Sequence, residues 1–189
     1  MTLKLHTLVT STRPGRAGIH VARWFHEVAS SHGRFEAELV DLADFNLPVY
    51  DEPHHPRLRR YEHAHTLRWS ESVNAADAFV FVCPEYNYGP TPALVNALNY
   101  VYHEWHYKPV AFVSYGGASG GLRGVQSIKP VVTTLRMMPL PEGVMLPFVA
   151  QQIGSDGFAA TEPQQGSAIV LLDELLRWAE ALKRLRPQA

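Results

Sequence analysis

Strict alternation of short apolar runs with longer helix-patterned segments is the feature that most constrains the fold of this chain. The expected strands are residues 3–9, 35–42, 78–83, 109–114 and 143–149, and the expected helices are 19–32, 61–74, 93–102, 122–138 and 164–185. Such alternation favours a parallel sheet with right-handed crossovers and helices on both faces. It predicts an α/β fold, a flavodoxin-like three-layer sandwich with a five-stranded parallel sheet of order 2-1-3-4-5.

Individual segments support this fold prediction. The near-continuous apolar run at 78–83 is typical of a parallel strand that is covered on both faces. In the last helix, one apolar face is expected to be buried, formed by Ile169, Leu172, Leu175, Leu176 and Ala179. The proline- and histidine-rich segment 44–60 is expected to be a surface loop within one domain spanning 1–189, because periodic structure resumes on both sides.

Composition excludes several function classes. The net charge is −1 with histidine neutral, so no electrostatic footprint indicates binding to nucleic acid or to an anionic membrane. No apolar run is long enough to span a bilayer. Cys83 is the one cysteine, which fits a reducing, cytoplasmic compartment. The chain has ten histidines, but none pairs with cysteines or a carboxylate frame, so we expect no metal site.

Three loops follow predicted strands and share polar or glycine-rich composition. They are residues 10–18, 84–92 and 115–124. In the order 2-1-3-4-5 the first and third strands lie side by side and their connections leave on opposite faces, which opens a crevice at the carboxyl edge of the sheet. We expect the three loops to converge there into one composite site.

The first loop has the composition of a phosphate site. It offers hydroxyls, cations and glycines where a helix begins: Ser11, Thr12, Arg13, Gly15, Arg16 and Gly18. Open backbone N–H groups and the helix dipole favour an anion there. The loop lacks the P-loop lysine and the spaced glycines of a dinucleotide fingerprint, so a monophosphate fits better. The alternative is an ordinary strand–helix turn.

The other two loops suit a planar ligand. Tyr86 is able to lie against a ring, Asn87 to address polar atoms, and Pro84 and Pro90 to stiffen the turn. Alternatively, Tyr86 packs internally and Glu85 caps the following helix. In the third loop, the pairs 116–117 and 120–121 are Gly-Gly and allow close backbone approach to a ligand, although mobile linkers have the same composition.

Together these motifs resemble the NAD(P)H-dependent FMN reductase family, which includes quinone, azo and chromate reductases. The resemblance covers residues 3–149 and rests on three motifs: Ser11-Thr12-Arg13-Pro14-Gly15-Arg16, Pro84-Glu85-Tyr86-Asn87 with Pro92-Ala93-Leu94-x-Asn96-Ala97, and Ser114-Tyr115-Gly116-Gly117 with Gly120-Gly121. It implies bound FMN and a homodimer or homotetramer.

The resemblance also implies roles for individual residues. The FMN phosphate would be held by Ser11, Arg13, Arg16 and nearby backbone including Gly18. The ribityl chain and ring would be lined by Pro84, Glu85, Tyr86 and Asn87, and the isoalloxazine bordered by Tyr115, Gly116 and Gly117. Many relatives have Gly-Ser after the asparagine, whereas Tyr88-Gly89 follows here. Tyr88 and the Trp105 region are expected at the substrate mouth.

The implied function is hydride transfer from NADPH or NADH to FMN, and then to a small acceptor such as a flavin or quinone. The flavin carries this chemistry, so no catalytic side chain is required, and one shared face predicts ping-pong kinetics. The alternatives are a flavodoxin-type electron carrier and a flavodoxin-fold protein without cofactor. The near-neutral charge disfavours the first, and the intact phosphate loop disfavours the second.

Overall fold

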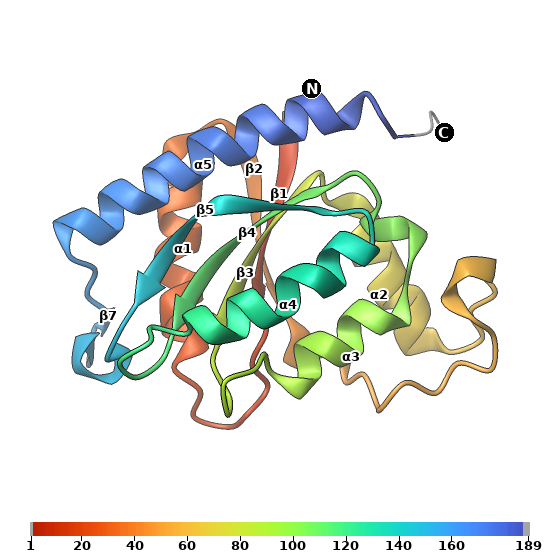
Figure 1. Ribbon diagram of the computed structural model, residues 1–189, viewed down its shortest axis with the longest axis horizontal. Helices are drawn as coiled ribbons and strands as arrows, with labels where there is room; N and C mark the ends of the chain where they lie inside the picture. The colour runs from red at the N-terminus through yellow and green to blue at the C-terminus, as the bar shows by residue number, and fades with distance from the viewer. Residues whose placement is uncertain (1, 187–189) are drawn as a thin grey trace.

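A computed structural model describes residues 2–186. Its centre is a five-stranded sheet of β1 (Leu3–Val9), β2 (Phe35–Asp41), β3 (Ala78–Pro84), β4 (Pro109–Tyr115) and β5 (Met138–Leu146). The order is β2-β1-β3-β4-β5 and every neighbouring pair is parallel. The predicted sheet is confirmed, with all carboxyl ends at one edge (Figure 1).

Helices cover both faces of the sheet (Figure 1). Helices α1 (Gly18–His32) and α5 (Glu162–Lys183) pack on one face, and α2 (Ala64–Ala75), α3 (Pro92–Tyr100) and α4 (Leu122–Thr134) on the other. The connections carry 3-10 turns at η1 (Leu42–Phe45), η2 (Pro56–Leu58), η3 (His103–Trp105) and η4 (Val149–Gln152) and a small hairpin of β6 (Ile153–Gly154) and β7 (Gly157–Phe158). The sequence reading contained neither these turns nor the hairpin.

Strand β3 shows why an unbroken apolar run belongs at the centre of the sheet. Successive side chains of a strand point to opposite faces. Val80 and Val82 accordingly lie in the core beneath α1 and α5, whereas Phe79 and Phe81 lie in the core beneath α2, α3 and α4. All four are fully or almost fully buried.

The junction between α4 and β5 differs from the sequence prediction. The helix was expected to reach residue 138, but it ends at Thr134 because Arg136 takes a left-handed backbone, φ +56°, which stops helical hydrogen bonding. The strand was expected over 143–149, but it spans Met138–Leu146. It is an edge strand, where Pro139 is tolerated, and its pairing with β4 shifts register between Val110 and Phe112.

Two helix details also differ. Residues 61–63 precede α2, which begins at Ala64. In α5, Ile169 is exposed, at 48%, so its expected place on the buried face was wrong. The buried face is Ala168, Leu171, Leu172, Leu175, Leu176 and Ala179. Within residues 2–186, no helix combines the length and apolarity needed to cross a membrane.

Candidate active site

The loop after β1 begins with a residue, Thr10, that is hydrogen-bonded to two neighbouring segments, and its tip is exposed. Thr10 Oγ1 donates to the carbonyl of Val82 at 2.9 Å. The Thr10 carbonyl in turn accepts from Thr91 Oγ1 at 2.7 Å. The side chains of Thr12 and Arg13 are exposed beyond this anchor. The loop therefore presents its polar tip from a rigid base at the crevice between β1 and β3.

The N-terminus of α1 has the properties of an anion site. Its N-cap, Ala17, provides no side-chain hydrogen bond, and the first turn contains no acidic residue. The first N–H groups of a helix have no intrahelical acceptor, and the dipole favours negative charge there. Gly15, at φ +68°, turns the chain into this helix. Arg13 adds an exposed cation on the same short loop.

Arg16 has a partner that the sequence did not suggest. Its guanidinium forms an ion pair with Asp41, at the end of β2. The Nε atom of Arg16 is buried and has no hydrogen-bond partner among the described residues. Burying an N–H without an acceptor costs free energy. Arg16 thus supports the loop through Asp41 and leaves one donor that a phosphate oxygen would satisfy.

The loop after β3 is a two-residue hairpin. Tyr86 and Gly89 exchange backbone hydrogen bonds of 2.9 Å in both directions. Asn87 and Tyr88 between them have φ of +50° and +66°, the pattern of a type I′ turn. Tyr86 is partly exposed, at 36%. The turn therefore holds Tyr86 at a fixed position beside the crevice.

Glu85 fastens this hairpin to the glycine-rich loop. Its carboxylate accepts from Ser119 Oγ at 2.9 Å and from the Arg123 N–H at 3.0 Å, and pairs with Arg123 Nε at 3.0 Å. Glu85 thus caps α4, whose N-cap glycine offers no side chain. It does not cap α3, because Thr91 fills that role through the Leu94 N–H at 3.2 Å.

The glycine-rich loop combines tight packing with one open edge. Gly121 has φ +84°, and a Cβ there would lie 2.7 Å from backbone atoms of Tyr115, so only glycine fits. Gly117 is exposed, and a Cβ would meet nothing within 4 Å. The Gly116 N–H donates to Leu146 at 3.3 Å. The open edge for a ligand is consequently Gly117 and its neighbour Ala118.

A buried contact joins the first and third loops. Ser11 Oγ and Tyr115 Oη lie 3.1 Å apart, and both residues are almost fully buried. A Cβ on Gly18 would lie 2.4 Å from Tyr115 Oη and 2.6 Å from Ser11 Oγ. Burial raises the pKa of the Tyr115 hydroxyl, which keeps it protonated. These three residues form the support behind the crevice.

Of the two residues expected at the substrate mouth, the structure separates one from the site. Tyr88 is exposed, at 68%, next to the crevice, whereas Trp105 is 0% exposed, so its expected place at the mouth was wrong. Trp105 belongs to η3, beyond the far end of α3, and its ring lies 5.1 Å from Phe79 and 5.8 Å from Trp69. Aromatic packing in the core accounts for this residue.

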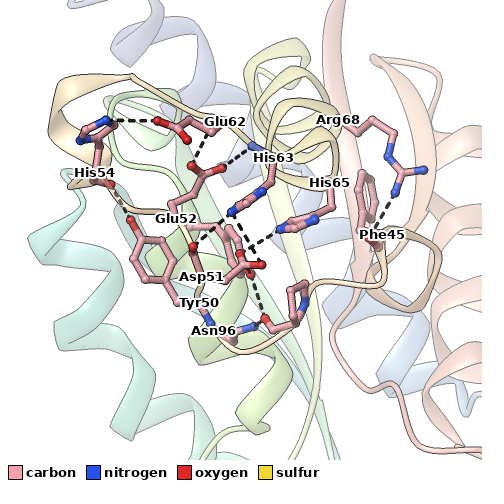
Figure 2. Close-up of polar contacts among 12 residues, drawn as sticks. Phe45, Tyr50, Asp51, Glu52, His54, Glu62, His63, His65, Arg68 and Asn96 are labelled. Carbon is pink, nitrogen blue, oxygen red and sulfur yellow. Dashed lines mark hydrogen bonds and ion pairs between the residues drawn. The ribbon is translucent and has the colours of Figure 1, made fainter.

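A hollow of about 290 Å³ lies beside the tip of the first loop. Thr12, Ala43, Asn46, Ala93 and Asn96 are among its lining residues. Asn96 donates to the Pro48 carbonyl at 2.6 Å and accepts from the Tyr50 N–H at 3.0 Å (Figure 2). This wall was not among the residues expected at the site, although Asn96 is part of the motif that begins at Pro92.

The histidine-rich segment is built into a polar network. Asp51 accepts from Tyr100 Oη at 2.9 Å and contacts His65 Nε2 at 3.0 Å (Figure 2). Glu52 accepts the backbone N–H groups of Glu62 and His63 at 2.9 and 3.0 Å. Across residues 2–186, no group of three or more histidine, cysteine or carboxylate side chains is placed to hold a metal ion.

Comparison with known proteins identifies a matching family model and similar relatives. Residues 3–151 match the model of the NADPH-dependent FMN reductase family. An NAD(P)H-dependent FMN reductase from Nectria sp. is 35% identical over 187 residues, covering 96% of this chain and 90% of the relative. Another from Schizosaccharomyces pombe is 39% identical over 143 residues, covering 75% and 71%.

The fold has solved counterparts as well. The flavoenzyme NAD(P)H:(acceptor) oxidoreductase FerB from Paracoccus denitrificans superposes with a TM-score of 0.76, covering 95% of this chain and 98% of FerB, at 20% identity. At that identity the likeness supports the flavodoxin-like fold alone. The family match over most of the chain and the near full-length relative carry the conclusion: the chain belongs to the NADPH-dependent FMN reductase family.

Proposed function

We propose that this reductase binds FMN across the three loops, with the phosphate at the N-terminus of α1. The observation that carries the proposal is the uncapped, acid-free first turn of α1, next to the exposed Arg13 and the unpartnered Nε of Arg16. A dianionic phosphate would satisfy these donors. The buried Ser11 would act through Tyr115, and Gly18 by allowing their close approach.

The ring would lie between the Tyr86 hairpin and the open edge of the glycine-rich loop. Pro84 and Tyr86 would flank it, Asn87 would offer amide groups, and Gly117 would allow close approach of the backbone. Glu85 would hold the hairpin against the glycine-rich loop, and Tyr115 would hold the first loop against the glycine-rich loop, because their polar atoms are already used within the protein. Gly116 would help as part of the same turn.

FMN, when bound, supplies the acceptance of hydride from NADPH or NADH and its delivery to a small acceptor. The protein binds and orients the phosphate through the first loop. It holds the ring site through the hairpin and glycine-rich loop, and Tyr88 limits access to the open side. This chemistry requires no side-chain nucleophile, and burial raises the pKa of Cys83 to about 12, which keeps its thiol protonated.

The acceptor is proposed to be a flavin, a quinone or a similar planar molecule. The support comes from relatives, since one that is 34% identical over 127 residues is an NADPH azoreductase from a Bacillus species, and another that is 30% identical over 147 residues is a quinone reductase from Pseudomonas putida. We further propose that residues 1–189 form a single domain acting as a homodimer or homotetramer.

The test is an anaerobic titration. The purified protein is saturated with FMN, mixed with NADPH or NADH, and followed by flavin absorbance. We expect rapid bleaching that is reversed by a quinone, and the two donors are ranked by rate. Bound flavin that neither donor bleaches would instead indicate an electron carrier.

Arg13→Ala tests the phosphate site, with Arg23→Ala as the matched control, because Arg23 is an exposed arginine of α1 that lies beyond its first turn. We expect at least tenfold weaker FMN binding in Arg13→Ala and no change in the control. Equal affinity in both variants would overturn the phosphate assignment. Circular dichroism confirms that each variant is folded.

A further inference from the structure

A second, strongly basic pocket lies at the opposite edge of the sheet from the FMN loops. Its volume is about 940 Å³, within or near the range of small-molecule sites. Lys108, immediately before β4, lines it, which places the pocket at the amino edge. The C-terminal ends of α4 and α5 also reach this end of the molecule (Figure 1).

The charge of the pocket contrasts with that of the chain. Its lining includes five basic side chains and one carboxylate, Glu104: the basic ones are Arg57, Arg59, Lys108, Arg136 and Arg186. The chain as a whole has a net charge of −1. Concave surfaces lined by one sign of charge concentrate ions of the opposite sign.

Internal partners neutralise only part of this charge. Arg186 pairs with Asp77 at 2.6 Å. Glu104 is occupied by Tyr61 Oη at 3.1 Å and by Ser70 Oγ at 2.8 Å. Within residues 2–186, no carboxylate pairs with three of the arginines, Arg57, Arg59 and Arg136. The charge of these guanidinium groups is therefore available to a ligand.

The backbone that carries these arginines is held in place. His103 Nε2 contacts the Arg57 carbonyl at 2.9 Å, and the N–H of Tyr107 donates to the Arg136 carbonyl at 2.9 Å. The Asp51 and Glu52 network fixes the same loop just before η2 (Figure 2). Preorganised donors lose less entropy on binding than mobile ones.

Buried polar and aromatic side chains also line the pocket. Lys108 is buried and donates to the carbonyls of Val73 and Asn74 at 2.7 and 3.1 Å. Arg57 lies 4.7 Å from the centre of the Tyr102 ring. His106 Nε2 is buried and lacks a hydrogen-bond partner among the described residues. Arginine forks beside such surfaces match phosphate oxygens well.

We propose that this pocket is a second anion site, distinct from the FMN loops, which binds a small ligand carrying a diphosphate or longer phosphate chain. Three arginines from two separate segments line it, and a chain of two or more phosphates presents more oxygens to them than a single phosphate does. A chain of two or more phosphates therefore fits better than a single one.

Pyrophosphate is the probe, titrated by calorimetry into FMN-saturated protein so that the α1 phosphate site is filled. The test variant is Arg59→Gln/Arg136→Gln. The control is Arg34→Gln/Arg60→Gln, which removes the same charge from two exposed arginines that do not line the pocket. We expect at least tenfold weaker binding in the test variant, and binding close to that of the parent in the control.

Three outcomes would overturn the proposal. Equal weakening in both double variants would show a general charge effect, and unchanged binding in both would place pyrophosphate elsewhere. No pyrophosphate binding by the parent protein would remove the site. If FMN does not bind at all, the same titration is run on the Arg13→Ala variant without FMN, so that this test stands apart from the proposed function.

Discussion

The Arg123 guanidinium carbon lies 3.9 Å from the centre of the Tyr88 ring, while Nε of the same arginine pairs with Glu85 at 3.0 Å. One side chain thus links the residue before the hairpin to the tip of its turn. Tyr88 occupies the second left-handed position of this turn, where glycine is usually preferred. The stacked arginine gives a physical reason for a large residue there.

Replacing Tyr88 by glycine should widen access to the ring site while leaving the free energy of unfolding nearly unchanged. The change relieves a left-handed side chain, which costs about 1–2 kcal/mol, and loses a cation–π contact of about 0.5–1 kcal/mol. We expect the unfolding free energy to change by less than about 1.5 kcal/mol. The ratio of kcat/KM for a two-ring quinone to that for a one-ring quinone should rise several-fold.

Tyr88→Phe is the matched control, because it keeps the ring and its stacking on Arg123. Its quinone ratio should equal that of the parent protein. An unchanged ratio in the glycine variant would show that Tyr88 does not limit access.

The Ser11–Tyr115 contact predicts coupling between two loops. Tyr115→Phe removes the hydroxyl 3.1 Å from Ser11 Oγ, and a buried hydrogen bond contributes about 1 kcal/mol. We expect a loss of that order in unfolding free energy, together with weaker FMN binding. Urea denaturation and flavin titration measure the two quantities.

Ser11→Ala and the double variant complete a cycle for the same pair. Residues in direct contact are expected to show non-additive effects. The double variant should lose less than the sum of the single losses. Strict additivity in both measurements would mean that this bond does not join the loops energetically.

The sheet was predictable from sequence because its signal is local. Strand β3 is apolar without interruption, and the structure buries alternate residues such as Val80 and Phe81 on opposite faces. The loops that follow β1, β3 and β4 then had to meet at one edge. The strand order and the edge at which the three loops meet therefore followed from patterns within short windows.

Roles that depend on long-range partners were not predictable. Arg16 looked like a free cation, but Asp41, 25 residues away, pairs with it. Glu85 reaches across to Ser119 and Arg123. Trp105 was expected at the substrate mouth, but η3 places its side chain in the core. No window of neighbouring residues contains that information.

Burial of Trp105 gives the third prediction. It is fully buried against Phe79 and Trp69, and deleting a large core aromatic costs about 3–5 kcal/mol. We expect Trp105→Ala to lower the unfolding free energy by about that amount. In the fraction that remains folded, the ratio of kcat/KM for the two-ring quinone to that for the one-ring quinone should stay unchanged, because Trp105 does not reach the substrate mouth. A changed ratio with unaltered stability would contradict the core assignment.

Lys108 gives stability an unusual dependence on pH. Burial, with Arg186 as a further cause, lowers the pKa of its ammonium to about 7, against the opposing charges of Asp77 and Glu104. The unfolded chain has a lysine pKa of about 10.4. Between these values the unfolded state binds the extra proton, so the free energy of unfolding rises with pH from about 7 to about 10. The expected rise is up to several kcal/mol, since each pKa unit corresponds to about 1.4 kcal/mol.

Lys108→Met should abolish that rise, because it removes the titrating group and keeps a long side chain. Lys129→Met is the control, as Lys129 is only half-buried and should leave the rise in place. Urea midpoints at pH 7 and pH 9.5 measure the difference. If the stability of the parent protein and that of Lys108→Met change equally over that interval, Lys108 retains its proton and an ordinary pKa in the folded chain.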